Sequence, residues 1–505
     1  MPRTFTLTAQ ILFWVAALSY VVFFAFVANP APLQDLPNHV ARAAAISDLL
    51  FDDGKVFGQF YSFHPMICPY ILSDLIGAVL VGLLGPHGAT VTLATIAALG
   101  IPFATLFLAR SVGCAQATSY VAATIAFFFS LDWTFSAGYI AFRFGIAMAL
   151  VTIACFLRVL EHASAKRYAA FGLALVATYL IHLSGFVIVT GVFAAFALAD
   201  LFSARRIRMA AFLPGLMIFI LGVYHVIAAG DAAVGEVIRR SLSGKVEIAP
   251  LYLARVNSPS ESIFVKLGVL FCAIGATAVL RWRDPIARSL VIFTVTLGFI
   301  FLALPQNQLP DIGDVDVRAL PYIYLATSLA TVYVLSTAKS RVVQWSTAVV
   351  AFAFAMANIV ILGPSMHRQA EYLAAYSKTL DYLPPGTTVL PIDGTPREGL
   401  INPYLHGGSI ATYRRGVLTP YVFAGNGRFH MDYFRVHGLP GAPPGQWYKR
   451  RQFEQNWPAI GAAYQYAVVT KPTDLSHIGL CLQLVGDGPV SAVYRIRGAS
   501  PNCAQ

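Results

Sequence analysis

A short segment near the N-terminus carries four polar side chains whose spacing suits proton transfer and anion binding. The segment at 32–42 reads Pro-Leu-Gln-Asp-Leu-Pro-Asn-His-Val-Ala-Arg. If a helix begins at Leu36 or Pro37, where proline is tolerated in the first turn, polar side chains at i, i+3, i+4 and i+7 form one stripe. These are Asp35, Asn38, His39 and Arg42. Such a set offers a carboxylate or imidazole that can act as a general base and a guanidinium that can bind phosphate.

A purely structural interpretation of this stripe stays open. Asp35 would then cap an ordinary helix whose polar face is solvated. The opposite face is apolar and is predicted to lie on the membrane surface; it comprises Val40, Ala43, Ala44 and residues 46–51. Asp48, Asp52 and Asp53 are alternative acids, but Asp52-Asp53-Gly54 is typical of a turn that ends a helix.

Four further candidates lie within or beside apolar stretches. Asp74 is an ionisable residue inside such a stretch, where it either pairs with another protein group or contacts a substrate. His182 sits between two apolar runs, with the same two alternatives. Tyr139 and Arg143 lie one helical turn apart at a predicted membrane edge, where Arg143 either binds a phosphate or extends to the interface.

The elements that position these residues are membrane helices. The chain has 505 residues, of which 57% are hydrophobic and 12% charged, against roughly 25% charged in an ordinary soluble domain. About 20 apolar residues cross the hydrocarbon layer as a helix. Apolar stretches of this kind fall at about 8–28, 66–84, 89–110, 117–131, 138–158, 168–181, 184–202, 209–229, 263–281, 287–304, 319–337 and 342–363. We therefore predict an α-helical polytopic membrane domain over 1–363, with about 11–12 membrane helices, followed by a small soluble domain over 364–505.

Basic clusters predict which ends of these helices face the cytoplasm. The net charge of +11 is concentrated at the ends of apolar stretches, as in the positive-inside pattern, and no basic patch interleaved with aromatic residues suggests nucleic-acid binding. The clusters are Lys166-Arg167, Arg205–Arg208, Arg281–Arg288 and Lys339–Arg341. On this basis loops 29–65, 230–262 and 305–318 face the outer compartment together with the C-terminal domain. Because loop 29–65 lies outside and Lys166 lies inside, an odd number of membrane crossings must separate them. Four apolar stretches lie between them, so the shortest one, 117–131, is predicted to be re-entrant.

The C-terminal segment has the mixed pattern of a small α/β or α+β domain. A helical run is predicted at 368–383, and strands are predicted at 387–392, 466–470, 481–485 and 492–496. Cys481 and Cys503 are its only cysteines. An oxidising compartment would permit them to pair.

Arg318 is the candidate for binding a phosphate group. Loop 305–318 ends in Asp314-Val-Asp-Val-Arg, directly before an apolar stretch. The positive-inside bias does not account for Arg318, because this end of the stretch lies on the outer side. A guanidinium can bind phosphate through two hydrogen bonds, and Asp316 is a second candidate substrate contact. Alternatively, Arg318 forms a salt bridge with Asp314 or Asp316 that merely pins the loop.

These segments resemble those of the GT-C superfamily of membrane glycosyltransferases. The segment from Asp35 to Arg42 resembles the Asp-Tyr-Pro-Asn-His-Leu-Ala-Arg-like segment of a set of mostly uncharacterised bacterial members. Two further segments of this chain resemble other segments of the same set, namely Ile181-His-Leu-Ser-Gly-Phe and Asp316-Val-Arg-Ala-Leu-Pro. Protein O-mannosyltransferases and lipid A aminoarabinose transferases are more distant members.

The resemblance implies transfer of a sugar, with inversion, from a polyprenyl-phosphate donor to a glycan, lipid or protein acceptor of the bacterial cell envelope. It implies a multi-pass protein of the inner membrane, with Asp35 as catalytic base. Many members have paired acids at this place, whereas here Gln34 precedes Asp35, so a metal bridged by two carboxylates is not supported and the cofactor stays unknown. A transporter or flippase, and an anchored scaffold, are the rival interpretations. If the enzyme interpretation holds, Asp35 and Arg318 must converge on one substrate.

Overall fold

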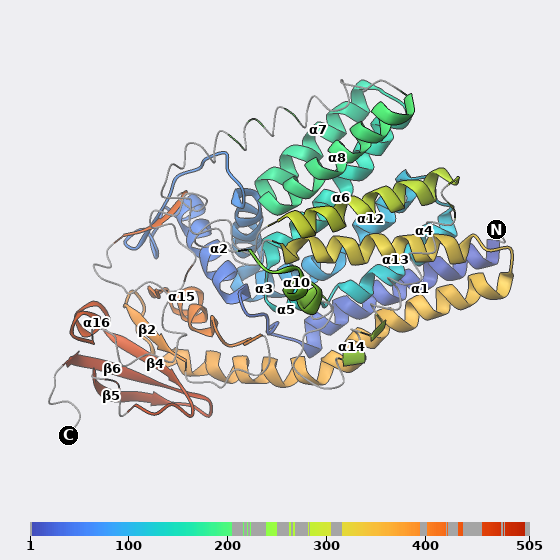
Figure 1. Cartoon of the computed structure of the whole chain (residues 1–505). Helices are drawn as coiled ribbons and strands as arrows, with labels where there is room; N and C mark the ends of the chain where they lie inside the picture. The colour runs from blue at the N-terminus through green and yellow to red at the C-terminus, as the bar shows by residue number, and fades with distance from the viewer. Residues whose placement is uncertain are drawn as a thin grey trace.

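In a computed structural model of the protein, the helices form an elongated bundle with a small sheet at one end (Figure 1). The structure describes residues 3–204, 239–249, 283–304, 316–393, 401–420, 433–437, 457–475 and 480–499, and isolated residues between them. The spans predicted at 209–229 and 263–281, and most of loops 230–262 and 305–318 including Asp314, lie outside the described residues.

The polytopic helical architecture predicted from the sequence is confirmed. The described residues contain six helices that are long and apolar enough to cross a membrane, and two shorter apolar helices at 116–129 and 183–196. The bundle comprises α1 (Arg3–Val22), its π-helical extension η1 (Phe23–Val27), α4 (Gln116–Ala126) with η2 (Phe127–Phe129), α5 (Trp133–Ser136), α6 (Ile140–Glu161), α7 (Ala165–Ile181), α8 (Leu183–Ala204), α12 (Pro285–Ala303) and α13 (Leu320–Ser336). Local signals define several starts: Ser164 and Asp284 accept backbone N–H bonds as N-caps of α7 and α12.

Helix α3 (Ile71–Ser111) joins two stretches that the sequence predicts as separate spans. At Gly85 the backbone leaves the helical region, with φ 69° and ψ 169°, and Pro86 begins the second part. The first part packs on the helix at 36–51, since a Cβ at Gly77 would lie 3.0 Å from the Cβ of Ala43. The first part is roughly 21 Å long and the second roughly 39 Å. The apolar helix at 116–129 has as few residues as the first part of α3, so the re-entrant element at 117–131 stays a prediction.

Helix α2 (Leu36–Phe51) begins at Leu36, one of the two residues predicted, but most of its apolar face is covered by protein. The side chains from Val40 to Ile46 are buried within the protein, and Arg42 itself is only 1% exposed. The predicted placement on the membrane surface is therefore wrong for Val40–Ile46, and the alternative of a solvated polar face is wrong too, because α3 and the C-terminal segment cover the helix. Leu50 and Phe51, at its end, are exposed. The turn predicted at Asp52–Gly54 is confirmed, with positive φ at Asp53 and Gly54.

The last membrane helix continues into the C-terminal domain. Helix α14 (Arg341–Thr379) has 39 residues, roughly 59 Å, and runs through the boundary predicted at 363/364 to the 3-10 turn η8 (Leu380–Tyr382). It carries the sheet at the end of the molecule opposite the N-terminus (Figure 1). The helical run predicted at 368–383 is thus its extension.

The C-terminal sheet contains the four strands predicted from the sequence. They are β2 (Val389–Ile392), β4 (Tyr466–Thr470), β5 (Leu480–Asp487) and β6 (Ser491–Ala499). The order is β2-β4-β6-β5, with β2 parallel to β4 and the other pairs antiparallel. The short elements η9 (Gly407–Ser409), α15 (Ile410–Arg415) and α16 (Trp457–Ala463) accompany it. Cys481 is disulfide-bonded; Cys503 lies outside the described residues.

A second, two-stranded sheet joins the first loop to the C-terminal segment. Strand β1 (Tyr61–Phe63) pairs antiparallel with β3 (Phe434–Val436), with Ser62 opposite Arg435. Because paired strands must share one compartment, loop 29–65 and the C-terminal domain lie on the same side of any membrane. No local pattern in the chain predicted this pairing.

Candidate active site

Asp35 is held at the start of α2 by backbone contacts with the turn before α6. The backbone N–H groups of Gln34 and Asp35 donate to the carbonyls of Ser136 and Ala137, each at 3.1 Å. The approach needs glycine at 138, where φ is +76° and a Cβ would lie 2.5 Å from the Asp35 nitrogen. The Asp35 carboxylate makes no capping bond to α2. It is 9% exposed, so it is nearly enclosed but available to groups other than its own helix.

The C-terminal domain closes over this carboxylate. His406 Nε2 lies 3.3 Å from Asp35 Oδ1, and the backbone N–H of Asn402 donates to Gln34 Oε1 at 3.2 Å. Ser409 Oγ donates to the side-chain oxygen of Asn38. Nothing in the local sequence predicted His406 as a site residue, because it reaches Asp35 only through the path of α14 and the loop at 401–409.

Of the remaining stripe residues, Arg42 pairs with Asp74, and His39 is held neutral. Arg42 Nη2 donates to Asp74 Oδ1 at 2.6 Å, and both side chains are buried. The Tyr433 hydroxyl donates to the other oxygen of Asp74. The structure therefore places Asp74 in a buried ion pair that joins α2, α3 and the C-terminal segment. Burial, with the neighbouring Arg42 charge, lowers the pKa of His39 to about 3, so its imidazole is neutral near pH 7.

Arg318 lies among aromatic rings and a histidine. It belongs to the 3-10 turn η7 (Val317–Ala319), directly before α13. Its guanidinium carbon lies 5.5 Å from the ring centre of Tyr139 and 5.6 Å from that of Phe142, which is within cation–π range. Arg318 Nη1 lies 3.2 Å from His182 Nε2, and the guanidinium also bonds the hydroxyl of Tyr70.

Tyr70 and His182 are themselves held in unusual positions. Tyr70 has a φ of +76°, which is rare for a residue other than glycine and marks stored backbone strain. Its ring meets the His182 ring edge-on, with centres 4.8 Å apart. His182 approaches α6 where position 145 is glycine, since a Cβ there would lie 2.7 Å from the His182 Cβ. Such strain is typical of functional sites, and the sequence alone did not single out Tyr70.

Asp316 and Arg143, two predicted substrate contacts, are engaged by the protein itself. The buried Asp316 carboxylate pairs with Arg240 at 3.4 Å and with Lys245 at 3.7 Å, and Lys245 lies on the short helix α10 (Leu242–Ile248). Arg143 donates to Asp132 and to the carbonyls of Phe129 and Ser130 at 3.0–3.1 Å. Tyr139, one turn earlier, turns instead toward Arg318.

The structure brings Asp35 and Arg318 to the same short segment. Asp35 contacts the backbone at 137–138, and Arg318 contacts the ring of Tyr139. The backbone of Asp35 and the guanidinium of Arg318 thus contact residues 137–139 from two distant parts of the chain. Among the described residues, no group of three or more His, Cys, Asp or Glu side chains could hold a metal ion.

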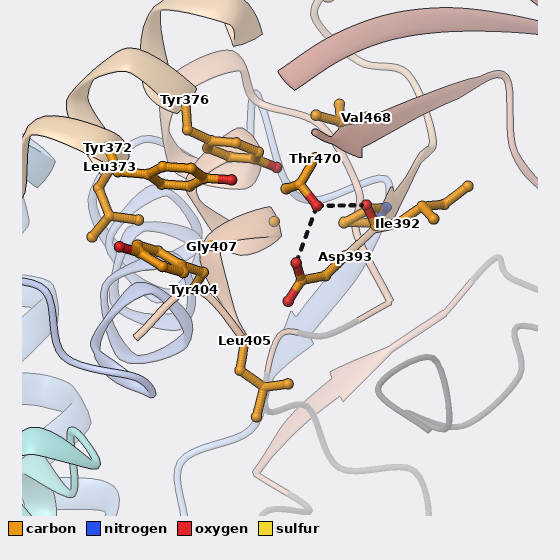
Figure 2. Close-up of a pocket in the computed structure, with 12 residues that line it drawn as sticks. Tyr372, Leu373, Tyr376, Ile392, Asp393, Tyr404, Leu405, Gly407, Val468 and Thr470 are labelled. Carbon is orange, nitrogen blue, oxygen red and sulfur yellow. Dashed lines mark hydrogen bonds between the residues drawn. The ribbon is translucent and has the colours of Figure 1, made fainter. Parts of the chain in front are cut away.

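A pocket in the C-terminal domain borders the loop that carries His406. It is lined by Tyr372 and Tyr376 of α14, by Tyr404, and by Asp393 and Thr470 at the ends of β2 and β4 (Figure 2). Leu405 and Gly407, the neighbours of His406, also line it. Thr470 Oγ1 donates to Asp393 Oδ1 at 3.1 Å (Figure 2). The pocket and the carboxylate of Asp35 therefore share one loop.

The fold matches two membrane glycosyltransferases of known structure. ArnT from Cupriavidus metallidurans in the apo state aligns with a TM-score of 0.57 and 15% identity, over 96% of this chain and 97% of that chain. ArnT bound to undecaprenyl phosphate aligns with a TM-score of 0.52 and 13% identity, over 98% and 99%.

A mutant of the mycobacterial arabinofuranosyltransferase AftD aligns with a TM-score of 0.54 and 15% identity, over 97% of this chain and 42% of that chain. No protein-family model and no curated protein matches the sequence. At these identities the similarity shows the fold, and the fold is the one predicted from the GT-C resemblance.

Proposed function

We propose that this protein is a GT-C-type glycosyltransferase that moves a sugar from a polyprenyl-phosphate donor to a cell-envelope acceptor at the outer face of the membrane, with inversion. One observation supports the proposal: the backbone of Asp35, in the first loop, and the guanidinium of Arg318, at the start of α13, contact the same segment at 137–139. The displacement requires a base and a phosphate-binding cation at one site. ArnT has been solved with undecaprenyl phosphate bound, which supports a donor of this class.

The reaction follows from these two groups. Asp35 takes the proton of an acceptor hydroxyl while that oxygen attacks the anomeric carbon of the donor sugar. The bond between this carbon and the phosphate oxygen breaks, and its electron pair stays on the departing polyprenyl phosphate. Arg318 stabilises the charge that develops there. Attack opposite to the departing phosphate inverts the anomeric centre.

The neighbouring residues position these two groups. His406 contacts the carboxylate of Asp35. His39, which is neutral near pH 7, and Arg42, which is paired with Asp74, follow Asp35 on the same helix. Asn38 ties this helix to the C-terminal domain through Ser409. Tyr139 supports the guanidinium of Arg318. In this proposal Arg143, Asp74 and Asp316 act through the protein contacts described above rather than by touching the donor.

The distribution of charge supports an outer location for the site. The first loop and the C-terminal domain share one side through the β1–β3 pair. Lys166-Arg167 and Lys339–Arg341 lie at the starts of α7 and α14, away from the first loop and the C-terminal domain. This is the position expected for cytoplasmic loops. The disulfide at Cys481 supports an oxidising compartment for the domain.

Direct assay of sugar transfer tests the function. The full-length protein in lipid nanodiscs would be incubated with polyprenyl-phosphate sugars, and envelope glycans would be compared in cells with and without it. We expect an envelope glycan or lipid to lose one sugar in the absence of the protein. Unchanged envelope glycans together with altered movement of a lipid-linked sugar across the membrane would favour a transporter instead.

Sidedness is tested by thiol labelling in a background without reactive cysteines. Cysteine in place of Ser62 or Tyr382 should react with an impermeant reagent from outside, whereas cysteine in place of Lys339 should react only from the cytoplasm. Labelling of position 382 from the cytoplasm alone would overturn the outer location.

A further inference from the structure

The pocket between the end of α14 and the C-terminal sheet is lined by groups that can hydrogen-bond a ligand. Tyr372 and Tyr376 lie one helical turn apart on α14, so they share one face of the helix. Because β2 and β4 run parallel, their carboxyl ends meet at one edge of the sheet and bring Asp393 beside Thr470. Figure 2 shows the two tyrosine hydroxyls pointing toward this pair. Hydroxyl groups and a carboxylate therefore converge on one pocket.

The hydroxyl of Tyr376 is buried without a partner. The residue is only 3% exposed, yet its O–H makes no hydrogen bond within the part of the chain that the structure describes. Its neighbour Tyr372, in contrast, donates to the carbonyl of Val490 at 3.5 Å. A buried polar group is costly to leave unbonded. A tyrosine at position 376, where phenylalanine would fill the same space, therefore indicates that a polar group enters the pocket.

The group that enters must both accept and donate a hydrogen bond. The O–H of Tyr376 needs an acceptor, whereas the carboxylate of Asp393 takes donors. A carboxylate has about four acceptor positions, so Asp393 can bond a ligand hydroxyl alongside protein donors such as Thr470 and Asn402. A hydroxyl fulfils both requirements at once. An ammonium group only donates, and a phosphate only accepts and would be repelled by the carboxylate.

The size and lining of the pocket favour the hydroxymethyl arm of a sugar. Its cavity volume of about 20 Å³ is enough for one small group, so a whole sugar ring stays at the mouth. The hydroxymethyl arm carries the primary hydroxyl of a hexose and projects from the ring. The rings of Tyr372 and Tyr404, with centres 4.2 Å apart, supply an apolar wall. Such a wall beside a few fixed polar groups is typical of small-molecule sites.

The pocket lies one side chain away from the carboxylate of Asp35. Leu405 and Gly407 line the pocket. His406, between them, has its Nε2 3.3 Å from Asp35 Oδ1. A glycan with one unit held in the pocket therefore has its neighbouring unit within reach of the proposed base. This position suits the acceptor, because the acceptor is the substrate whose hydroxyl loses its proton to Asp35.

We propose that this pocket binds a primary hydroxyl of the saccharide that accepts the transferred sugar. The hydroxyl accepts a hydrogen bond from Tyr376 and donates one to Asp393. Only the identification of this saccharide as the acceptor rests on the proposed function; the binding of a sugar does not. The pocket then anchors the acceptor and takes no part in the proton transfer.

Sugar binding by the full-length protein in nanodiscs tests the pocket. The probes are the methyl glycosides of glucose, galactose, mannose and N-acetylglucosamine, each beside its 6-deoxy analogue, which lacks the primary hydroxyl. Saturation-transfer NMR gives their dissociation constants. Tyr376→Phe removes only the hydroxyl, and Asp393→Asn removes the charge. Tyr382→Phe is the matched control, because it makes the same change at a residue that is 51% exposed just beyond α14.

We expect at least one glycoside to bind, and its 6-deoxy analogue to bind about threefold to tenfold more weakly, which is the usual effect of one hydrogen bond between neutral groups. Tyr376→Phe should weaken the glycoside by the same factor and leave its 6-deoxy analogue unchanged. Asp393→Asn should weaken the glycoside about tenfold or more, because a charge-assisted bond is lost. Tyr382→Phe should bind like the wild type.

Thermal unfolding separates a ligand site from a structural role of the hydroxyl. Because the Tyr376 hydroxyl has no partner in the sugar-free protein, Tyr376→Phe should unfold at the temperature of the wild type or above it. A clearly lower unfolding temperature would show that the hydroxyl serves the fold, and would overturn the inference.

The remaining outcomes separate this inference from the proposed function. Equal binding of the glycosides by Tyr376→Phe and the wild type means that the pocket holds water only, and it overturns the inference, as does the absence of binding by every probe. Binding through Tyr376 in a protein that transfers no sugar supports the pocket and contradicts the proposed function. Sugar transfer with an unchanged KM for the acceptor in Tyr376→Phe supports the proposed function and contradicts the pocket.

Discussion

Two arginines next to the 127–139 segment are used in opposite ways. Arg143 is 1% exposed, and its guanidinium donates to Asp132 and to the carbonyls of Phe129 and Ser130. Arg318, on the other side of Tyr139, meets the ring of His182 and the two aromatic rings that support it. One guanidinium is bonded by a carboxylate and backbone carbonyls, whereas the other lies among aromatic rings beside an imidazole.

The Arg143 region belongs to a larger set of contacts that satisfy a helix break. After η2 the chain leaves helical geometry, and its carbonyls need partners within the bundle. The amide of Asn358 donates to the carbonyls of Phe127 and Phe128 at 3.0 and 2.7 Å, and the Tyr20 hydroxyl donates to Phe127 at 3.0 Å. Irregular backbone is tolerated within a membrane only when it is satisfied in this way. Polar residues in an apolar stretch are therefore not by themselves evidence of a substrate site.

The partner, rather than the residue type, therefore decides the role of a buried arginine.

Arg143→Gln should prevent the protein from folding stably. The change leaves Asp132 as an unpaired buried charge and several carbonyls without donors, which costs about 3–5 kcal/mol. Thermal unfolding and monodispersity in detergent measure the effect. The same substitution at Arg318 serves as the matched control: Arg318→Gln should fold like the wild type and lose transfer activity. If both variants fold equally well, the two arginines do not differ in the way described here.

Asp35→Asn should lower the rate of sugar transfer about 10²–10⁴-fold while the protein remains folded. The substitution removes the base but keeps the shape of the side chain. Transfer is measured as single-turnover rate with saturating donor. Asp52→Asn, at the exposed end of the same helix, should retain wild-type activity. Near-normal transfer by Asp35→Asn would remove the carboxylate from the proposed mechanism.

His406→Ala should lower transfer about tenfold, because one hydrogen bond that positions the Asp35 carboxylate is lost. The loss should fall on kcat rather than on the KM for the donor, since His406 contacts Asp35 and not the phosphate side of the site. His406→Gln, which keeps a donor, should recover part of the rate. A change confined to the KM for the donor would contradict this positioning role.

His39 should produce the smallest effect, a loss of stability in acid. Its pKa is about 3 in the folded protein and about 6.5 in an unfolded chain, so between these values the unfolded chain binds more protons. Stability is therefore fully present above about pH 6.5 and falls as the pH drops toward 3. Relative to His39→Asn, the wild type should lose about 1 kcal/mol between pH 7 and pH 5, a value reduced because the ring is half-buried. Parallel pH curves for the two proteins would show that His39 is not held neutral by its surroundings.

Local patterns in the sequence were enough to predict most elements of this protein and the position of several candidate residues along them. The apolar stretches, the start of α2 at Leu36 and the four strands of the C-terminal sheet all follow from local signals, namely hydrophobic length, a proline in a first turn and strand-forming residues between turns. The turn after α2 is likewise encoded by Asp52-Asp53-Gly54. Such features depend on neighbours in the chain, so a linear pattern is enough to predict them.

The partner of each charged group, in contrast, depends on the tertiary structure. Arg42 finds Asp74 across α3, Asp316 pairs with Arg240 and Lys245 rather than pinning Arg318, and Asp35 receives His406 from the C-terminal domain. Arg143 and Arg318 are both single arginines at membrane edges in the sequence, and their contrast arises only when the 127–139 segment is folded between them. Contacts across hundreds of residues depend on how helices pack and where α14 delivers the C-terminal domain, and no local pattern records that packing.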